Sequence, residues 1–416
     1  MNNMTLQEMG LQAKHAALPL QKIDSKTKSA GLLAIADALR SHASRILEAN
    51  QKDVEAFVQK NGKSAMVDRL TLTKERIEEM ARGVEKVESL PDPIGEVTGM
   101  IKRPNGLVIG TKRVPLGVIG IIYEARPNVT VDAAALCLKT ANACILRGGS
   151  EAILSNSVLV DVMTEALDAV GFPKGCLQLV RDTSRETARE LMRLSPYLDV
   201  LIPRGSKGLI RSVVENATVP VIETGAGNCH VYVERTADFS MATDIFVNAK
   251  TSRPSVCNAC ESLLVDEAIA KELLPIIAEA VKPYQVEIRG CEKTCAILPE
   301  AVMASEEDYY TEYNDFIVSV KVVADIEEAI DHINEHGSRH SEAIITRDYA
   351  MANRFLEEID AAAVYVNAST RFTDGNEFGY GAEIGISTQK LHARGPMGLT
   401  ALTSTKHIIY GNGQIR

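Results

Sequence analysis

The chain has 416 residues, of which 45% are apolar, and its formal net charge at pH 7 is −10. This length favours two or three domains, each with a sizeable core. The negative charge argues against sequence-independent binding to nucleic acid, which needs a basic surface, and no run approaches the roughly 18 apolar residues of a membrane span. We therefore expect a soluble globular protein that binds neither nucleic acid nor a membrane.

Eight cysteines are scattered along the chain without the spacing of a disulfide framework. The first residues lack the basic region and the apolar core of a secretory signal. Both observations predict reduced thiols in a cytoplasmic protein.

Residues 1–90 alternate apolar and charged positions with a helical period, which predicts a helical layer. The clearest helix follows Thr73, a plausible N-cap, and Pro91 and Pro93 stop it. The apolar residues of its predicted buried face are Ile77, Met80, Ala81, Val84 and Val87.

Short β-like runs separated by glycine and proline occupy residues 97–120 and predict a hairpin. A second strand-like run, 403–410, has no local partner. These distant strands could pair with each other or with another subunit.

Apolar strands alternate with helices between residues 117 and 222, which predicts a parallel sheet covered on both faces. A helix is predicted at 153–170, and another opens with a capping box that begins at Thr183. Ligands of such sheets bind at the carboxyl ends of the strands. The predicted strands are residues 118–123, 143–146, 177–180, 199–202 and 219–222.

A second α/β unit follows residue 227. Its predicted helices are residues 240–250, 267–280, 326–335 and 349–359, and its predicted strands are residues 263–265, 286–288, 316–323, 343–346 and 363–367. Glycine-rich loops at 378–385 and 392–398 are of the kind that closes a site.

The polar loop before residues 262–265 delivers Cys257, which we interpret as a nucleophile because Arg253 beside it favours a thiolate. The alternatives are a buried core cysteine, a redox pair with Cys260, or half of a zinc site. A zinc site needs two further ligands at suitable spacing, so we predict no metal.

Two strand ends have the chemistry of an anion site, although the chain lacks a G-x-G-x-x-G motif. Arg147, Gly149 and Ser150 follow one strand, and Arg147 with Ser150 would suit the extra phosphate of NADP. Gly205 and Ser206 begin a helix, whose N-terminus attracts anions, on what we expect to be an adjacent strand. Either could instead be a simple turn.

Another strand-to-helix junction contains Asn128. It is a turn or capping residue by default, and it becomes a candidate oxyanion donor only if it faces Cys257.

Five stretches together resemble the gamma-glutamyl phosphate reductases, also called glutamate-5-semialdehyde dehydrogenases, a divergent family of the aldehyde dehydrogenase superfamily. The likeness covers essentially the whole chain. The stretches are Tyr123-Glu-Ala-Arg-Pro-Asn-Val-Thr-Val131, Leu146-Arg-Gly-Gly-Ser-Glu-Ala152, Ser252-Arg-Pro-Ser-Val-Cys-Asn-Ala259, residues 329–342 and His392-Ala-Arg-Gly-Pro-Met-Gly-Leu399.

The resemblance implies an aldehyde-dehydrogenase-like α/β fold with two Rossmann-like domains and a small β oligomerisation element. It places an NADPH-binding domain at 1–226, interrupted by an arm at 100–116, a catalytic domain at 227–398 and an oligomerisation strand at 399–416. A homo-oligomer, dimer or tetramer, and glutamate 5-kinase as a candidate partner are also implied.

The implied reaction is reduction of L-glutamyl 5-phosphate by NADPH to L-glutamate 5-semialdehyde and phosphate, the second step of proline biosynthesis from glutamate. Cys257 matches the catalytic cysteine, which forms a thioester, and Asn128 matches the oxyanion asparagine. Glu312 matches a glutamate that holds the nicotinamide ribose. Glu223 occupies the place of a hydrolytic base in a divergent motif, and we group it with the cofactor-binding residues.

Charge alone suggests Arg126 and Arg253 for the substrate phosphate or carboxylate, and ordinary ion pairs are the equal alternative. Two other hypotheses stay open. One is a hydrolytic, NAD-preferring aldehyde dehydrogenase with Glu223 as its base. The other is a non-catalytic protein in which Cys257 is packing or pairs with Cys260.

Overall fold

The computed structural model describes residues 4–60, 64–124 and 126–416. The first three residues of the N-terminal stretch, and Ala125 in the motif at 123–131, therefore lie outside the described residues. Two compact units share the chain. Unit 1 comprises Met1–Glu223, Gly379–Gly385 and Met397–Arg416, and unit 2 comprises Thr224–Phe378 and Ile386–Pro396.

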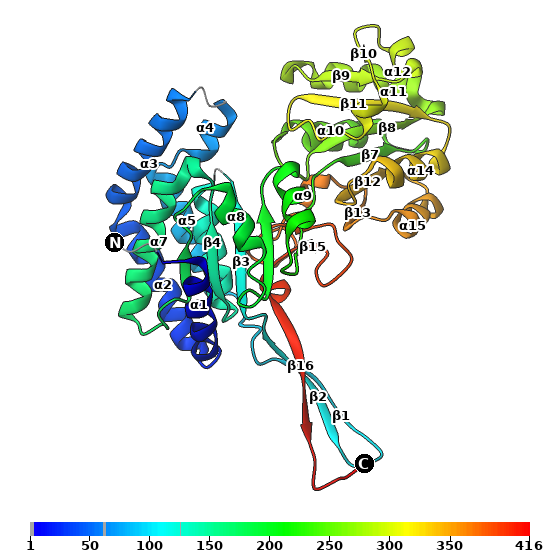
Figure 1. The fold of residues 1–416 in the computed structure, drawn as a ribbon. Coiled ribbons are helices and arrows are strands. Elements are labelled where there is room, and N and C mark those ends of the chain that lie inside the picture. Colours follow the sequence, from blue (N-terminus) through cyan, green and yellow to red (C-terminus); the bar gives the residue numbers. More distant parts are fainter. Residues whose placement is uncertain (1–3, 61–63, 125) are drawn as a thin grey trace. The chain divides into compact units, whose positions relative to one another are not determined.

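A layer of helices begins unit 1 (Figure 1). Thr73 caps the last of them, its hydroxyl accepting from the Arg76 N–H, and the five predicted apolar residues are buried. The predicted helix and its cap are confirmed, and the helix ends just before Leu90, where prolines follow. The helices are α1 (Leu6–Leu20), α2 (Ser25–Ser41), α3 (Ala43–Gln59), α4 (Ser64–Leu70) and α5 (Lys74–Ser89).

The sheet of unit 1 is parallel, with strand order β5-β4-β3-β6, which confirms the predicted sheet. Its strands are β3 (Val118–Tyr123), β4 (Ala143–Arg147), β5 (Leu177–Leu179) and β6 (Val200–Arg204). The helices between and after them are α6 (Pro127–Lys139), η1 (Ser150–Ala152), α7 (Ile153–Ala169), α8 (Arg185–Met192) and α9 (Lys207–Asn216).

Two local predictions in this sheet are wrong. The run 219–222 forms only an isolated bridge from Val221 to Leu201, because Pro220 has no N–H to donate to a strand ladder. The cap of α8 is Ser184, one residue later than predicted, since the Ser184 hydroxyl accepts from the Thr187 N–H.

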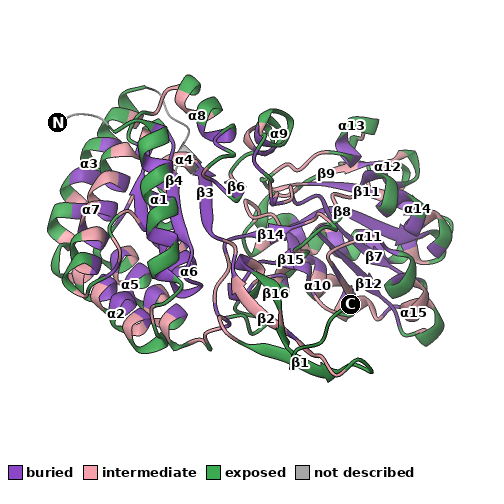
Figure 2. Cartoon of the chain, turned by 60° about the horizontal axis from the view of Figure 1, so that its bottom comes forward, coloured by how far each residue is buried: buried purple, intermediate pink, exposed green. Residues whose placement is uncertain are grey.

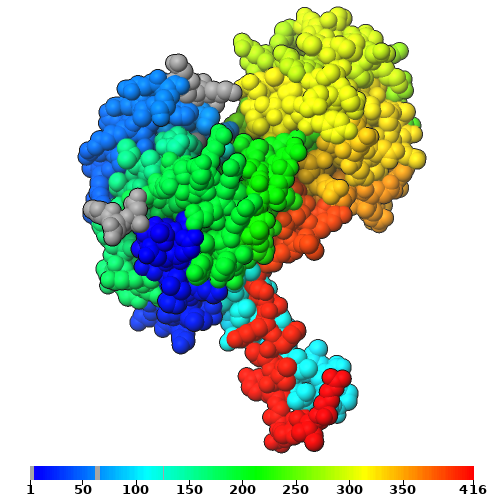
Figure 3. Space-filling model, in the orientation of Figure 1, coloured from blue at the N-terminus to red at the C-terminus, as the bar shows by residue number. Residues whose placement is uncertain are grey.

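A three-stranded antiparallel arm, defined as β1 (Val97–Lys102), β2 (Val108–Pro115) and β16 (Thr403–Tyr410), joins distant parts of unit 1. Val108 lies opposite Tyr410, and Pro115 lies opposite Thr403. The two strands without local partners therefore pair with each other. Figure 3 shows the cyan and red segments of the arm against one another, and every residue of β1 is exposed.

Unit 2 is built on a seven-stranded parallel sheet of order β10-β9-β11-β8-β7-β12-β13. All the strands and helices predicted in this unit are present, with small shifts at their ends. The strands are β7 (Cys229–Val233), β8 (Cys260–Asp266), β9 (Glu287–Gly290), β10 (Val302–Met303), β11 (Ile317–Val323), β12 (Ser341–Ile345) and β13 (Ala363–Val366). The prediction missed β7, the short β10 and two short helices, α12 (Glu292–Ile297) and α13 (Glu306–Tyr309).

Helices cover both faces of this sheet, so its strands β7, β8 and β12 are buried while the outer helix surfaces are exposed (Figure 2). Alternate residues of one strand serve different cores: Leu263 and Val265 pack in one cluster and Leu264 in the other. The helices are α10 (Phe239–Thr251), α11 (Glu267–Val281), α12 (Glu292–Ile297), α13 (Glu306–Tyr309), α14 (Ile326–His336) and α15 (Tyr349–Glu358).

Short elements complete the chain. They are η2 (Lys282–Tyr284), η3 (Thr370–Phe372), β14 (Ile386–Ser387), β15 (Gly395–Pro396) and η4 (Leu399–Leu402). A helix of the length and apolarity needed to cross a membrane is absent from the described residues.

Candidate active site

Cys257 lies half-buried in the loop between α10 and β8. It occupies a tight turn that is closed by a hydrogen bond from the Ala259 N–H to the Val256 carbonyl, 3.0 Å. The next residue, Asn258, is buried and anchors the turn: its carbonyl accepts from the Thr370 hydroxyl at 2.8 Å, and its amide donates to the Thr373 carbonyl at 2.9 Å. The position of Cys257 is therefore fixed by its neighbour.

The backbone of Cys257 rests on the segment that leads into β7. A Cβ on Gly227 would lie 1.6 Å from the Cys257 carbonyl oxygen, so only glycine allows this approach. The Cys229 thiol donates to the same oxygen at 3.2 Å. Glu312 accepts from the Gly227 N–H at 2.9 Å, which brings this predicted cofactor-binding carboxylate to the segment that packs against the Cys257 backbone.

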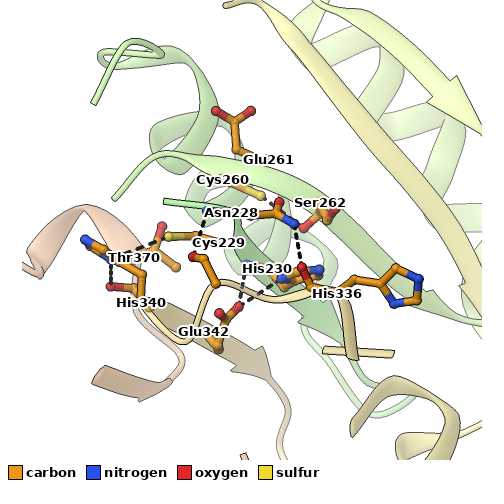
Figure 4. Close-up of polar contacts among 12 residues, drawn as sticks. Asn228, Cys229, His230, Cys260, Glu261, Ser262, His336, His340, Glu342 and Thr370 are labelled. Carbon is orange, nitrogen blue, oxygen red and sulfur yellow. Dashed lines mark hydrogen bonds and ion pairs between the residues drawn. The ribbon is translucent and has the colours of Figure 1, made fainter. Parts of the chain in front are cut away.

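A buried polar layer lies among the neighbours of this segment (Figure 4). Glu342 accepts from the His230 N–H at 2.6 Å and faces His230 Nδ1 at 3.1 Å. Burial raises the pKa of Glu342, and His230 partly offsets that effect. Asn228 donates to the carbonyls of Tyr309 and His336, at 2.7 and 2.9 Å. These bonds connect β7 to β12, and the residue just before β7 to the ends of α13 and α14.

Cys260 differs from Cys257 in its surroundings. It is fully buried in the core of unit 2, and burial raises the pKa of its thiol to about 12. The structure thus places Cys260 in packing, as we predict. All eight cysteines lie in the described part of the chain, and none of them forms a disulfide.

Beside Cys260 lies a buried ion pair. Lys250 Nζ is 2.5 Å from Glu261 Oε2, and neither side chain has exposed area. Burial raises the pKa of Glu261 to about 7, although Lys250 favours its ionised form.

Two arginines belong to the neighbourhood of the Cys257 turn. Arg253 is exposed on the loop itself. Arg371, in η3, is half-buried and donates to the Ser252 hydroxyl at 3.0 Å and to the Asn258 side-chain oxygen. Burial lowers the pKa of Arg371 and Arg253 lowers it further, while Cys257 raises it. Sequence reasoning missed Arg371, and its only signal was a basic residue in the polar stretch after 363–367.

At the end of β4 in unit 1, Arg147 is held by backbone carbonyls. Its Nη2 donates to the Thr183 carbonyl at 2.8 Å, while its buried Nε has no hydrogen-bond partner. Burial lowers the pKa of Arg147, and Glu151 opposes that shift. A Cβ on Gly149 would lie 2.0 Å from the Glu151 carboxylate, and Ser150 is exposed beside it.

The second predicted anion site already holds a carboxylate. The Ser206 N–H donates to Glu124 Oε2 at 2.8 Å, and a Cβ on Gly205 would lie 2.5 Å from that oxygen. Ser206 caps α9, so the side chain of Glu124 sits where a helix attracts anions. The two sites are also not on adjacent strands, because β3 lies between β4 and β6.

Three further predicted residues, Asn128, Arg126 and Glu223, belong to unit 1. Asn128 is exposed in the first turn of α6 and donates to Asp132 at 3.2 Å. Arg126 is the N-cap of that helix. Glu223 is the last residue of the first segment of unit 1. Cys257 and Arg253 belong to unit 2, and the roles of Asn128, Arg126 and Glu223 stay predictions.

Among the described residues, no group of three His, Cys, Asp or Glu side chains could hold a metal ion. Cys291 is the N-cap of α12, and its thiol accepts from the Val322 N–H. Cys295 lies within the same helix.

Comparison with known proteins places these features in a family context. The family model described as "Aldehyde dehydrogenase family" matches residues 2–299 and 302–408. The gamma-glutamyl phosphate reductase of Clostridium perfringens (strain SM101 / Type A) is 61% identical over 407 residues, 98% of each chain. That of Carboxydothermus hydrogenoformans is 62% identical over 406 residues, 97% of this chain and 98% of the relative.

A solved structure is similar as well. The crystal structure of gamma-glutamyl phosphate reductase from Thermotoga maritima has a TM-score of 0.97 and 49% identity, and the match covers 99% of this chain and 100% of that chain. The similarity extends across both units and the arm.

Proposed function

Because this chain belongs to the aldehyde dehydrogenase family and, within it, to the gamma-glutamyl phosphate reductases, we propose that it reduces L-glutamyl 5-phosphate to L-glutamate 5-semialdehyde with release of phosphate. This reaction is the second step of proline biosynthesis from glutamate. The observation that carries the mechanism is the anchored turn that holds Cys257 half-buried, with Arg371 bonded to the residues Ser252 and Asn258 on its two sides.

Covalent catalysis by Cys257 splits the reaction into two easier steps. The thiolate attacks C5 of the acyl phosphate, the C5–O bond breaks, and phosphate leaves with the electron pair and takes up a proton. After reduction of the thioester, the thiohemiacetal collapses, so that the C5–S bond breaks and the thiolate is regenerated. Asn128 is our proposed donor to the oxyanion at C5.

The hydride donor is a nicotinamide cofactor, and we propose NADPH. When bound, it supplies the hydride that reduces the thioester. The turn of Arg147, Gly149 and Ser150 fits its extra phosphate, because the buried Arg147 Nε has no hydrogen-bond partner. Gly205 and Ser206 can contribute only if Glu124 leaves the start of α9. We propose that Glu312 and Glu223 complete the cofactor site.

A general base is not required in this mechanism, because phosphate leaves as the thioester forms and no water molecule has to be activated to attack it. The hydrolytic alternative with Glu223 as base is therefore not favoured. The acyl phosphate that the proposed reductase consumes must come from a glutamate kinase, and we propose this kinase as the partner. We also propose that the enzyme acts in the cytoplasm.

The arm suits a role in assembly, as we propose. Its strand β1 has one edge that no strand of the described residues pairs with, and it is exposed throughout, with Met100 and Ile101 among its apolar residues. An unpaired, apolar strand edge favours pairing with another chain, here a second copy of this one.

A single assay tests the function. The chain is supplied with NADP and L-glutamate 5-semialdehyde, and NADPH formation is followed with and without phosphate. We expect turnover that depends strictly on phosphate. Turnover without phosphate would support the hydrolytic alternative, and an absence of turnover would leave a non-catalytic protein on this fold.

We predict that Arg147→Met weakens NADPH binding by about tenfold to a hundredfold, because one hydrogen bond to a charged phosphate is lost. NADH binding should change little. The measurement is a titration of cofactor fluorescence, with Arg181→Met, which removes an exposed ion pair to Asp161 in the same unit, as the control. An equal loss for NADH and NADPH would show that Arg147 does not contact the 2′-phosphate.

A further inference from the structure

Arg371 is a half-buried cation that the structure places beside the Cys257 turn. Its guanidinium reaches both sides of that turn, to Ser252 before Cys257 and to Asn258 after it. Both acceptors are uncharged. Since Asn258 adjoins Cys257 in the chain and is itself buried, the guanidinium is held at a fixed place next to the nucleophile.

The charge of Arg371 is not neutralised by an ion pair. Within the described residues, no carboxylate forms an ion pair with Arg371 or with Arg253, whereas Arg394 in the same unit pairs with Asp360 at 2.6 Å. Arg253 and Arg371 are near enough to repel each other electrostatically. The carboxylate of Asp374 partly offsets this repulsion without forming an ion pair with Arg371. Two neighbouring cations without a paired carboxylate, one of them partly desolvated, form a site that an anion stabilises.

We propose that Arg371 and Arg253 form the subsite that receives the 5-phosphate of the substrate beside Cys257, a proposal that rests on the function proposed above. Guanidinium groups match the geometry of phosphate oxygens with paired N–H donors. As the sulfur of Cys257 bonds to C5 and the C5–O bond breaks, negative charge grows on the departing phosphate. The two arginines would stabilise that charge and retain the phosphate until it takes a proton from solvent.

We expect Arg371 to stabilise the Cys257 turn as well, because it bonds to Asn258. If Arg371 were merely structural, its loss would affect the KM values for phosphate and for L-glutamate 5-semialdehyde alike in the reverse reaction. A phosphate-binding Arg371 would affect phosphate selectively. The α-carboxylate of the substrate is the other anion that the pair could bind, so the experiment must separate the two anions.

The first measurement uses the reverse reaction with Arg371→Gln, Arg371→Lys and Arg253→Gln. We expect Arg371→Gln to raise the KM for phosphate by about tenfold to a hundredfold, and the KM for L-glutamate 5-semialdehyde by less than about twofold. Arg371→Lys, which keeps the charge without the fork, should recover part of the loss. Arg354→Gln on α15, whose side chain pairs with Glu358, is the control and should leave both constants unchanged.

The second measurement does not depend on turnover. Inorganic phosphate should slow the alkylation of Cys257 by iodoacetamide, followed by mass spectrometry of the Cys257 peptide because Cys291 and Cys295 are also half-buried. The protecting concentration should rise about tenfold to a hundredfold in Arg371→Gln. Glutamate, which has carboxylates but no phosphate, should protect Cys257 equally in the unchanged protein and in Arg371→Gln.

The outcomes separate the subsite from the function. The proposed subsite is wrong if phosphate fails to protect Cys257. It is also wrong if Arg371→Gln leaves the protection by phosphate unchanged, or if this variant weakens the protection by glutamate instead. If phosphate protects and Arg371→Gln weakens it, but turnover is independent of phosphate, the subsite stands and the proposed function fails.

Discussion

Cys257→Ala is expected to lower kcat on the order of 10⁴-fold or more, because no other group near C5 can form the thioester. Phosphate would then have to be displaced without a covalent intermediate. The measurement is NADPH oxidation with L-glutamyl 5-phosphate. The melting temperature should hardly change, because Cys257 is half-buried in a turn that Asn258 anchors independently.

Cys260→Ala is the matched control for this prediction. Cys260 is fully buried at the start of β8, so its loss leaves a small cavity and should lower the free energy of unfolding by about 1 kcal/mol. Most of kcat should remain. Equal losses of activity in the two variants would refute a single nucleophile at Cys257 and would favour a redox role for the pair.

Local patterns predicted the elements well where all the local signals agreed. The helix after Thr73 has a hydroxyl cap, one apolar face and a proline stop, and all three agree with α5. The arm required a long-range pairing, and 403–410 had only one plausible partner strand within the chain. The run 219–222 failed because its apolar composition concealed the effect of Pro220 on hydrogen bonding.

The surroundings of the site were harder to predict because they depend on tertiary contacts. The rule that ligands bind at the carboxyl ends of parallel strands does not find Cys257, which precedes β8 and touches the segment before β7. Arg371 reaches the turn only because the chain returns there after β13. The carboxylate that occupies the start of α9 comes from Glu124, on a different strand-to-helix junction, and no local pattern indicates that contact.

Lys250→Met is expected to destabilise the protein by about 3–5 kcal/mol at pH 8, because it leaves the carboxylate of Glu261 buried without its cation. Methionine preserves the length of the side chain, so packing changes contribute little. Asn314 still donates its N–H to Glu261, at 3.1 Å, but one neutral donor does not replace an ammonium group. Urea unfolding followed by circular dichroism measures the effect, since the chain has no tryptophan.

The pH dependence of this loss identifies its cause. The folded pKa of Glu261, about 7, lies above the ordinary value of 4.5, so the native state binds the proton more tightly than the unfolded chain does. The associated stability is present below pH 4.5 and is lost as the pH rises through 7. Removing Lys250 raises the folded pKa further, so the destabilisation should be smaller at pH 5 than at pH 8.

The double variant Lys250→Met with Glu261→Gln separates charge from packing. Glutamine keeps an acceptor for the Asn314 N–H and removes the ionisable group, so the double variant should regain most of the stability lost at pH 8 and should lose the pH dependence. A double variant as unstable at pH 8 as Lys250→Met alone would mean that the lysine stem, and not its charge, stabilises this core. A loss in Lys250→Met of equal size at pH 5 and pH 8 would lead to the same conclusion.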